Sequence, residues 1–149
     1  MTVSISALHR DDRAQWEQLY HAYAVFYKMP MTDEILDTVW GWIFDTENPF
    51  FAMIAKDEEG NAVGLMHFRE MPSPLRGALA GFLDDLYVKP EVRGSGCVQA
   101  MYKAMNIFGK DRGWPFIRWI TADNNYRGRS SYDKVATRTH WITYQMQVE

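Results

Sequence analysis

The sequence predicts a single domain over residues 1–149 that combines helices and strands, in the α/β (α+β) class. Its sheet is expected to be mixed, with helices on both faces. Six stretches suit strands, and three of them follow one another between residues 50 and 88, separated by turn and loop residues. Helical spacing of apolar residues precedes and follows that region. A composition of 47% hydrophobic and 23% charged residues supports a packed globular chain.

The N-terminal part is expected to form one strand and two helices. Residues 3–8 (VSISAL) alternate in polarity as a strand does. Residues 11–27 place their apolar side chains at helical spacing. A second helix is predicted over residues 32–45, because Thr32 follows Pro30 and is a good N-cap.

The central part is expected to form three sequential strands. A β-hairpin is predicted from residues 50–56, the turn DEEGN and residues 62–71. The prolines and glycine of residues 71–77 indicate a loop, and residues 78–88 form the third strand.

The C-terminal part is expected to continue as helix, strand, helix and strand. A helix should begin near Ser95 and run to about Arg112. The remaining elements are a strand over residues 114–122, a short helix over 126–136 and a last strand over 139–148.

Charge and cysteine content exclude several classes of partner. A formal net charge of −3 and a pI near 5.8 are unsuited to binding a phosphate backbone, so we expect no nucleic-acid partner. The single cysteine, Cys97, allows neither an internal disulfide nor a zinc cluster, and we expect no metal. The N-terminus lacks a signal-peptide core and no stretch is long enough to span a bilayer, so we expect no membrane association and a cytoplasmic setting.

The segment VRGSGCVQAM, residues 92–101, carries two glycines at the start of a predicted helix. Gly94 and Gly96 allow backbone angles that other residues avoid, and the first N–H groups of a helix attract anions. Arg93 adds a fixed positive charge. Two interpretations stand, an anion site and a tight strand-to-helix turn. A Walker loop is absent, and Gln99 does not fit a dinucleotide fingerprint.

A third phosphate-loop pattern fits this segment. Arg93, two intervening residues, Gly96 and a position two residues later have the spacing of an acetyl-coenzyme A (acetyl-CoA) pyrophosphate loop. With FLDDLYVKPEVRGSG before it and NNYRGRSSYDKV after it, the chain resembles the GNAT N-acetyltransferase superfamily. In motif it is most similar to spermidine/spermine-type amine acetyltransferases and to the fungal histone and D-amino-acid acetyltransferase-like branch. The resemblance implies a mostly antiparallel, twisted sheet of about six to seven strands, splayed at its central strands.

The resemblance also implies functional residues. Backbone groups of three strand residues would bind the pantetheine arm, and six loop residues would wrap the pyrophosphate. Asn125 would lie near the thioester, and Tyr132 would return a proton to the leaving thiolate, with an aromatic packing role as the alternative for Tyr132. The expected cofactor-binding set is Leu86, Tyr87, Val88, Arg93, Gly94, Ser95, Gly96, Cys97, Val98 and Asn125.

Two departures from the family pattern stand out. Val98 occupies a position where the family usually has glycine or alanine, so its branched side chain is expected to crowd the pyrophosphate. VATRTH, residues 135–140, replaces a common Gly-Phe turn and affects the last strand connection. Cys97 sits at a position that normally packs under the loop, so we expect no nucleophilic role for it.

The acceptor site is less defined by the sequence. Asp84 and Asp85 are consecutive in a strand and are expected to point to opposite faces. The resemblance gives Asp84 a role in holding a cationic amine; alternatives are a salt bridge to Arg76 or Lys89, or a partly wet cleft edge. Tyr27 is the aromatic candidate for the acceptor pocket, whereas Tyr23 and Phe26 are assigned to the core. His67 and Glu70 could relay a proton through water, but a surface or core role is favoured for each of them. No dedicated base is assigned.

These observations predict an N-acetyltransferase that moves the acetyl group of acetyl-CoA directly to the primary amine of a small molecule such as a polyamine or an amino acid. The backbone N–H of Val88 is expected to stabilise the developing oxyanion. Alternatives are a protein lysine or N-terminal acetyltransferase and a non-catalytic acyl-CoA-binding module. The aromatic C-terminal strand suits a homodimer.

Overall fold

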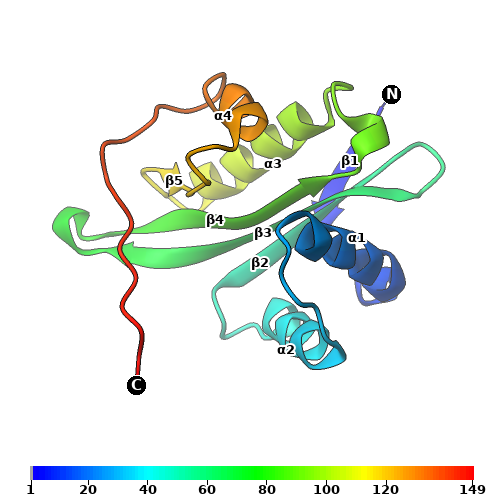
Figure 1. The fold of residues 1–149 in the computed structure, drawn as a ribbon, viewed down its shortest axis with the longest axis horizontal. Helices are drawn as coiled ribbons and strands as arrows, with labels where there is room; N and C mark the ends of the chain where they lie inside the picture. The colour runs from blue at the N-terminus through cyan, green and yellow to red at the C-terminus, as the bar shows by residue number, and fades with distance from the viewer. Residues whose placement is uncertain (1) are drawn as a thin grey trace. The chain divides into compact units, whose positions relative to one another are not determined.

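The structure is a computed structural model that describes residues 2–149. The chain divides into two compact units, residues 1–119 and 120–149. Figure 1 shows the elements in order along the chain. They are β1 (Ser4–Ala7), α1 (Arg13–Phe26), α2 (Asp33–Phe44), β2 (Phe50–Lys56), β3 (Ala62–Ser73), β4 (Ala78–Val88), α3 (Cys97–Asp111), β5 (Ile117–Arg118) and α4 (Tyr126–Tyr132).

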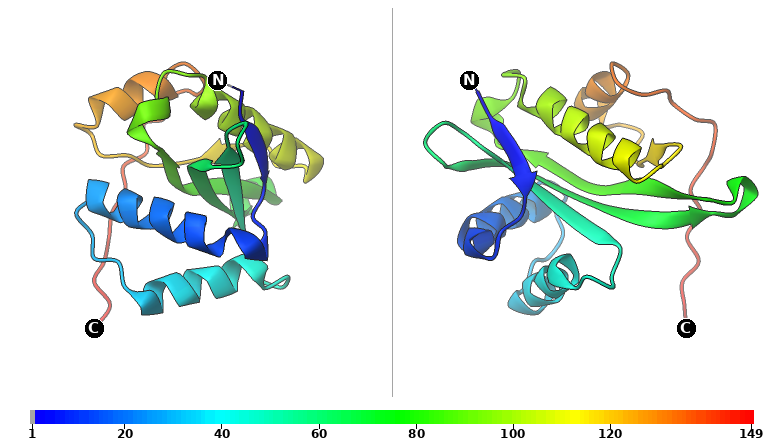
Figure 2. Two further views of the ribbon diagram at one scale, coloured as in Figure 1. Left: turned by 90° about the vertical axis from the view of Figure 1, so that its right-hand side faces the viewer. Right: turned by 180° about the vertical axis from the view of Figure 1, so that it is seen from behind.

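The first unit is built on one sheet in the order β1-β2-β3-β4-β5. Its neighbours are antiparallel except for the parallel pair β4 and β5. Helices α1 and α2 cover one face, and α3 covers the other (Figure 2). This arrangement confirms the predicted α+β class, with five strands in the described residues where six to seven were expected.

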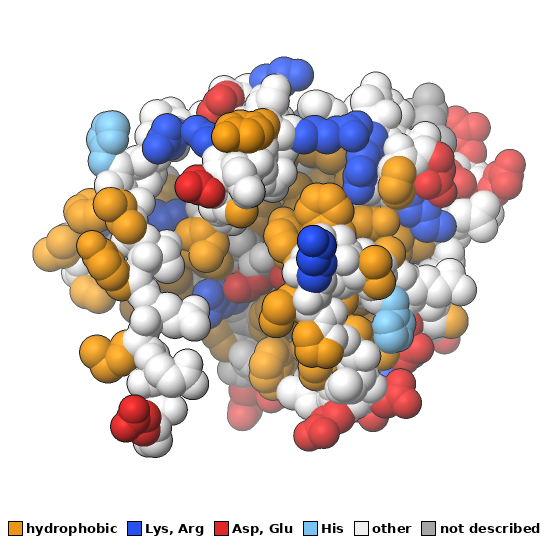
Figure 3. All heavy atoms as spheres, in the orientation of Figure 1, with side chains coloured by type: hydrophobic (Ala, Val, Ile, Leu, Met, Phe, Trp, Pro, Cys, Tyr) orange, Lys and Arg blue, Asp and Glu red, His pale blue; other side chains and the backbone are white. Residues whose placement is uncertain are grey.

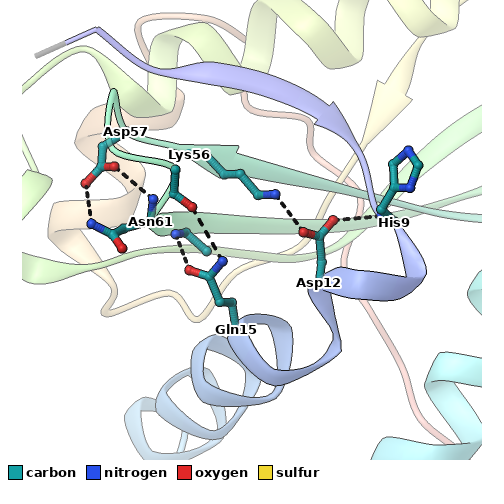
Figure 4. Close-up of polar contacts among 8 residues, drawn as sticks. His9, Asp12, Gln15, Lys56, Asp57 and Asn61 are labelled. Carbon is teal, nitrogen blue, oxygen red and sulfur yellow. Dashed lines mark hydrogen bonds and ion pairs between the residues drawn. The ribbon is translucent and has the colours of Figure 1, made fainter.

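Buried polar contacts tie the start of α1 to the sheet (Figure 4). The Asp12 carboxylate accepts the backbone N–H of His9 at 2.8 Å and the Lys56 ammonium at 2.6 Å. Two residues into the helix, the Gln15 side-chain oxygen accepts the N–H of Ala62, at the start of β3, at 2.7 Å. These bonds satisfy groups that burial would otherwise penalise, and they fix the helix against β2 and β3.

The core has a layer on each face of the sheet. Between the sheet and α1 and α2 it contains Trp16, Leu19, Leu36, Ile54 and Leu65, each at most 1% exposed. On the α3 face, the ring of the buried Phe68 lies 5.1 Å from the ring of Phe108 and 6.1 Å from that of Trp114. The two layers follow from alternation along β3, because successive side chains point to opposite faces.

The C-terminal elements are shorter than predicted. The strand expected over residues 114–122 is limited to Ile117–Arg118, and the helix expected over 126–136 ends at Tyr132. Within residues 2–149, the segment 139–148 belongs to no strand, so the last predicted strand is wrong for the isolated chain. Alternating polarity gives a segment two faces, but a strand also needs a neighbour for its backbone hydrogen bonds. No helix among the described residues is long and apolar enough to cross a bilayer.

Candidate active site

A β-bulge in β4 brings two carboxylates together. The register pairs His67 with Asp85 and the next residue, Phe68, with Leu83, which leaves Asp84 as the extra residue. A bulge places an additional side chain next to its neighbour, so alternation fails at this point. Asp84 and Asp85 line the same cavity, and the expectation that they point to opposite faces is therefore wrong.

The cavity encloses about 580 Å³ on the face of the sheet that α1 and α2 cover. Charged side chains supply one part of its lining and apolar or aromatic side chains another, which suits a small ligand with a charged group. The lining residues are Tyr20, Val39, Trp42, Asn48, Pro49, Phe50, Arg69, Glu70, Asp84 and Asp85.

Asp85 accepts hydrogen bonds from more than one element of the fold. Its Oδ2 atom lies 2.8 Å from Nδ1 of the buried His67 and accepts the hydroxyl of Tyr20 at 3.0 Å. Tyr23 also hydrogen-bonds to this carboxylate. Burial raises the pKa of Asp85, but the hydrogen bonds from His67 and the two tyrosines outweigh it, so the pKa lies below its ordinary value.

Asp84 is incompletely satisfied. Its Oδ1 atom lies 3.3 Å from Nη2 of Arg69, so its neighbouring cation is Arg69 and not the expected Arg76 or Lys89. Its Oδ2 atom is buried and has no hydrogen-bond partner among the described residues. Burial and the neighbouring Asp85 raise the pKa of Asp84 above its ordinary value, although Arg69 acts in the opposite direction.

The outer edge of β4 is largely open. β5 pairs only with Gly81 and Phe82, so in the described residues no strand pairs with residues 83–88 on that side. This open stretch contains Leu86, Tyr87 and Val88, whose backbone groups were predicted to bind pantetheine. An extended chain can add to such an edge as a further strand.

The loop after β4 presents the first turn of α3. Gly94 and Gly96 have φ angles of +80° and +93°, which L side chains rarely adopt. Gly96 is the N-cap of α3, and no side chain caps this helix. A helix start leaves its first N–H groups without intrahelical acceptors, so the backbone here offers several donors to an anion.

The other loop side chains have structural partners. The Arg93 guanidinium donates Nε to the carbonyl of Val88 at 3.2 Å, and the Ser95 hydroxyl donates to the carbonyl of Val92. α3 begins at Cys97 and not near Ser95. The Cys97 side chain is 2% exposed and burial raises the pKa of its thiol, which deprives it of the thiolate character that a nucleophile needs.

In the second unit, the Asn125 motif has a local structural role. Asn125 is the N-cap of α4, and its side-chain oxygen accepts the N–H of Gly128 at 3.2 Å. A Cβ atom on Gly128 would lie 2.5 Å from Nδ2 of Asn125, so the motif requires glycine there. Tyr132 is the last residue of α4. The roles of Asn125 and Tyr132 toward the acetyl donor stay predictions.

The aromatic residues at the end of α1 differ from expectation. Tyr20 lines the cavity, whereas Tyr27 does not and is 42% exposed, with its ring 4.8 Å from that of Tyr23. Phe26 is 55% exposed and does not belong to the core. Tyr23 is half-buried and reaches Asp85. Sequence reasoning missed Tyr20; its helical spacing with Trp16 was the available signal, but only the fold brings it to Asp85.

Comparison with known proteins decides the family. A model described as the acetyltransferase (GNAT) family matches residues 16–136, a range that includes the bulge, the glycine loop and α4. This chain belongs to the GNAT family. Members of this family use acetyl-CoA as the donor, so the chain is an acetyl-CoA-dependent acyltransferase.

Individual relatives agree with the GNAT assignment. The chain is 25% identical over 144 residues to the D-amino-acid N-acetyltransferase HPA3 of Saccharomyces cerevisiae. The aligned region covers 96% of this chain and 89% of that protein. It is 26% identical to the ribosomal-protein-alanine N-acetyltransferase of Brucella melitensis biovar Abortus 2308, with a TM-score of 0.81 over 99% of this chain and 100% of that one. AAC(6')-Iy in complex with a CoA-containing bisubstrate analogue has a TM-score of 0.86 over 99% of both chains, and at 15% identity it shows the fold alone.

Proposed function

We propose that this enzyme transfers the acetyl group of acetyl-CoA to a primary amine of a small cationic molecule, such as a polyamine or an amino acid, by direct attack in a ternary complex. The observation that carries the proposal is the carboxylate pair at the bulge, where Asp84 Oδ2 is buried without a partner among residues 2–149. A buried carboxylate oxygen is costly unless a donor reaches it, and an ammonium group supplies both donors and opposite charge. The names of the D-amino-acid and aminoglycoside acetyltransferase relatives support an amine acceptor of this kind.

The residues of the glycine loop fit the acetyl donor. The uncapped first turn of α3, the positive-φ glycines and the Arg93 charge suit a pyrophosphate, and the open edge of β4 suits a pantetheine arm. When bound, acetyl-CoA supplies an activated acetyl thioester. The residues proposed to hold it are Leu86, Tyr87, Val88, Arg93, Gly94, Ser95, Gly96, Cys97, Val98 and Asn125.

The chain's own groups then have simple tasks. Asp84 and Asp85 hold the ammonium form of the acceptor, which must lose a proton to solvent water before its nitrogen has a lone pair to attack. The Val88 N–H is proposed to face the oxygen on which negative charge develops. Tyr132 is proposed to donate a proton to the departing sulfur.

A two-stage assay tests the activity. Calorimetric titration with acetyl-CoA measures donor binding, and thiol release then measures turnover over a panel of polyamines, D- and L-amino acids, aminoglycosides and lysine peptides. Turnover of the small amines supports the proposal. Turnover of peptides alone would indicate a protein acetyltransferase, and binding without any turnover would indicate an acyl-CoA-binding module.

Tyr132→Phe tests the proposed proton donor. Loss of a general acid typically costs about 10²–10⁴-fold in rate. We expect a fall in kcat of at least about tenfold, with an unchanged Kd for acetyl-CoA, measured by thiol release and calorimetry. Tyr126→Phe, on the first turn of the same helix, is the matched control. Equal kcat values for Tyr132→Phe and the parent would discard the role.

We also propose that the enzyme works in the cytoplasm as a homodimer. Apolar side chains are exposed along its C-terminal segment (Figure 3). Trp141, Ile142, Tyr144, Met146 and Val148 are between 76% and 90% exposed. Sedimentation equilibrium tests this: the double variant Trp141→Ser, Tyr144→Ser is expected to be monomeric, whereas Leu75→Ser, which alters an exposed apolar residue elsewhere, should not change the mass. A monomeric parent chain would refute the dimer.

A further inference from the structure

We infer that Trp16 and His67 are positioning residues of the acceptor site, and that together they hold Asp85 as an ionised, immobile hydrogen-bond acceptor beside Asp84. The inference rests on the proposed function, because it explains how a cavity for a cationic amine retains its negative charge.

The hydrogen bonds around His67 define where its proton lies. The indole N–H of Trp16 lies 2.9 Å from Nε2 of His67, and an indole can only donate. Nε2 must therefore accept, which places the ring proton on Nδ1, the atom 2.8 Å from Asp85 Oδ2. Trp16 and His67 are both 0% exposed, so water does not compete for either bond.

Packing from several elements keeps the imidazole in place. Trp16 and Tyr20 approach it from α1, with ring centroids at 6.0 Å and 4.7 Å, and Phe50 approaches it from β2 at 5.5 Å. Asp85 lies opposite His67 in the β3–β4 register, directly after the bulged residue. A ring confined in this way holds its partner in one orientation, which is the usual requirement for a site that must bind a ligand in a fixed position.

The remaining groups that face Asp85 do not replace His67. From α1, Tyr20 and Tyr23 donate to the carboxylate; burial, followed by the charge of Asp85, raises the pKa of each phenol, so both stay protonated. Tyr27, the C-cap residue of α1, hydrogen-bonds to Tyr23. The charged groups near the pair are Asp84 on β4, which disfavours a second negative charge, and Arg69 on β3, which contacts Asp84. Without the His67 donor, burial would dominate and Asp85 would take up a proton at a higher pH.

The decisive variants are His67→Phe and His67→Asn. His67→Phe fills the space without a donor, whereas the asparagine amide can replace the Nδ1 donor. The acceptor is the panel amine with the lowest KM, and its KM is measured between about pH 4 and about pH 8.5, a range in which a primary amine stays cationic. KM should rise in both proteins as the pH falls. We expect the rise for His67→Phe to be at least about tenfold larger than the rise for the parent, and we expect kcat to change less than KM. His67→Asn should restore most of the parent profile, and the Kd for acetyl-CoA should not change.

A second readout needs no acceptor. In ¹⁵N NMR spectra of the parent at neutral pH, His67 is expected to carry its proton on Nδ1 and to leave Nε2 unprotonated. The Asp85 carboxyl should titrate below about 3.9 in the parent and above that value in His67→Phe. If His67→Phe does not fold, Trp16→Phe keeps the imidazole and removes only the indole donor, and its Nε2 resonance should move away from the parent position.

The possible failures are distinguishable. A proton on Nε2 in the parent, or a His67→Phe pH profile that matches the parent while amines still turn over, would overturn this inference alone. Absence of turnover for every panel amine, with the expected NMR result, would overturn the proposed function and leave the hydrogen-bond order intact. A purely structural role for His67 predicts a lower melting temperature with an unchanged pH profile.

Discussion

Two regions differ in whether their polar groups have hydrogen-bond partners: the start of α1, and the segment from the β4 bulge to the start of α3. Asp12 is 5% exposed, and both of its carboxylate oxygens accept hydrogen bonds, one from the His9 N–H and one from the Lys56 ammonium. Among the described residues, Asp84 leaves one buried oxygen without a partner, and Gly96, the N-cap residue before α3, provides no side-chain cap. Buried polar groups without hydrogen-bond partners lower stability. They are therefore expected mainly at sites where a bound ligand supplies the missing partner.

The two helix starts that follow loops make the same point. The Thr32 hydroxyl accepts the N–H of Ile35 at 3.2 Å and completes the first turn of α2. The first turn of α3 has no such acceptor, and its N-cap is a glycine with a positive φ. The first arrangement stabilises a helix, whereas the second leaves the first N–H groups of α3 available in the loop that we propose to hold the pyrophosphate of acetyl-CoA.

The largest expected effect is that of Asp84→Asn on acceptor turnover. Removing the charge and one acceptor oxygen should lower kcat/KM for the amine about 100-fold, the scale of losing a charge-assisted hydrogen bond of up to about 3 kcal/mol. Because the folded-state pKa of Asp84 is raised, its ionised form opposes folding above the unfolded pKa, and the variant should unfold at the same temperature or higher. Steady-state kinetics and calorimetric melting measure both. Unchanged kinetics would break the comparison, because Asp84 would then be no more functional than Asp12.

Next in size is the effect of Gly96→Ala on donor binding. A side chain at a φ of +93° is strained, and relief of that strain should turn the N–H groups of α3 away from the anion. We expect the Kd for acetyl-CoA to rise about tenfold, equivalent to about 1.4 kcal/mol. Gly60→Ala, at a φ of +84° in the β2–β3 turn, is the matched control and should lose similar stability without affecting Kd. Equal Kd values for the two variants would contradict the assignment of the loop.

Asp12→Asn should affect stability alone. Loss of a charged hydrogen bond to Lys56 is expected to lower the free energy of unfolding by about 2 kcal/mol at neutral pH, with kcat and KM unchanged. Burial raises the pKa of Asp12, but Lys56 and the His9 N–H lower it further, so the folded value lies below the unfolded one. The stabilisation is therefore present above about pH 3.9 and is lost as the pH falls through the folded pKa. Urea unfolding at several pH values checks this, and a constant difference between parent and variant down to low pH would refute it.

The smallest effect concerns Val98→Ala. A smaller side chain at this half-buried position should relieve crowding and tighten acetyl-CoA binding by about twofold to fivefold, or less than about 1 kcal/mol. Ile107→Ala makes a similar change on an exposed position of the same helix and serves as the control for helix propensity. A Kd that stays the same in Val98→Ala would show that the branched side chain does not crowd the site.

Elements with a local cause were predicted well. The strand at residues 78–88 was predicted with its observed bounds, since its composition and its flanking loops define it. The Thr32 cap was predicted because a threonine hydroxyl reaches the N–H three residues later within one turn. The positive-φ turn before α3 was predicted from Gly94 and Gly96, because only glycine adopts these backbone angles readily.

The sequence alone determined the α+β class, the order of the elements to α4, the glycine loop and the family. The class and the order of the elements depend on periodicity and on contacts within a few residues, whereas the loop and the family rest on the resemblance of two motifs to GNAT sequences. Only the tertiary structure decided the bulge at Asp84, the Trp16–His67–Asp85 hydrogen bonds and the lack of a strand partner for the C-terminal segment within one described chain. The physical reason is that strand register and contacts between residues 51 positions apart depend on how the sheet assembles, and no local pattern encodes them.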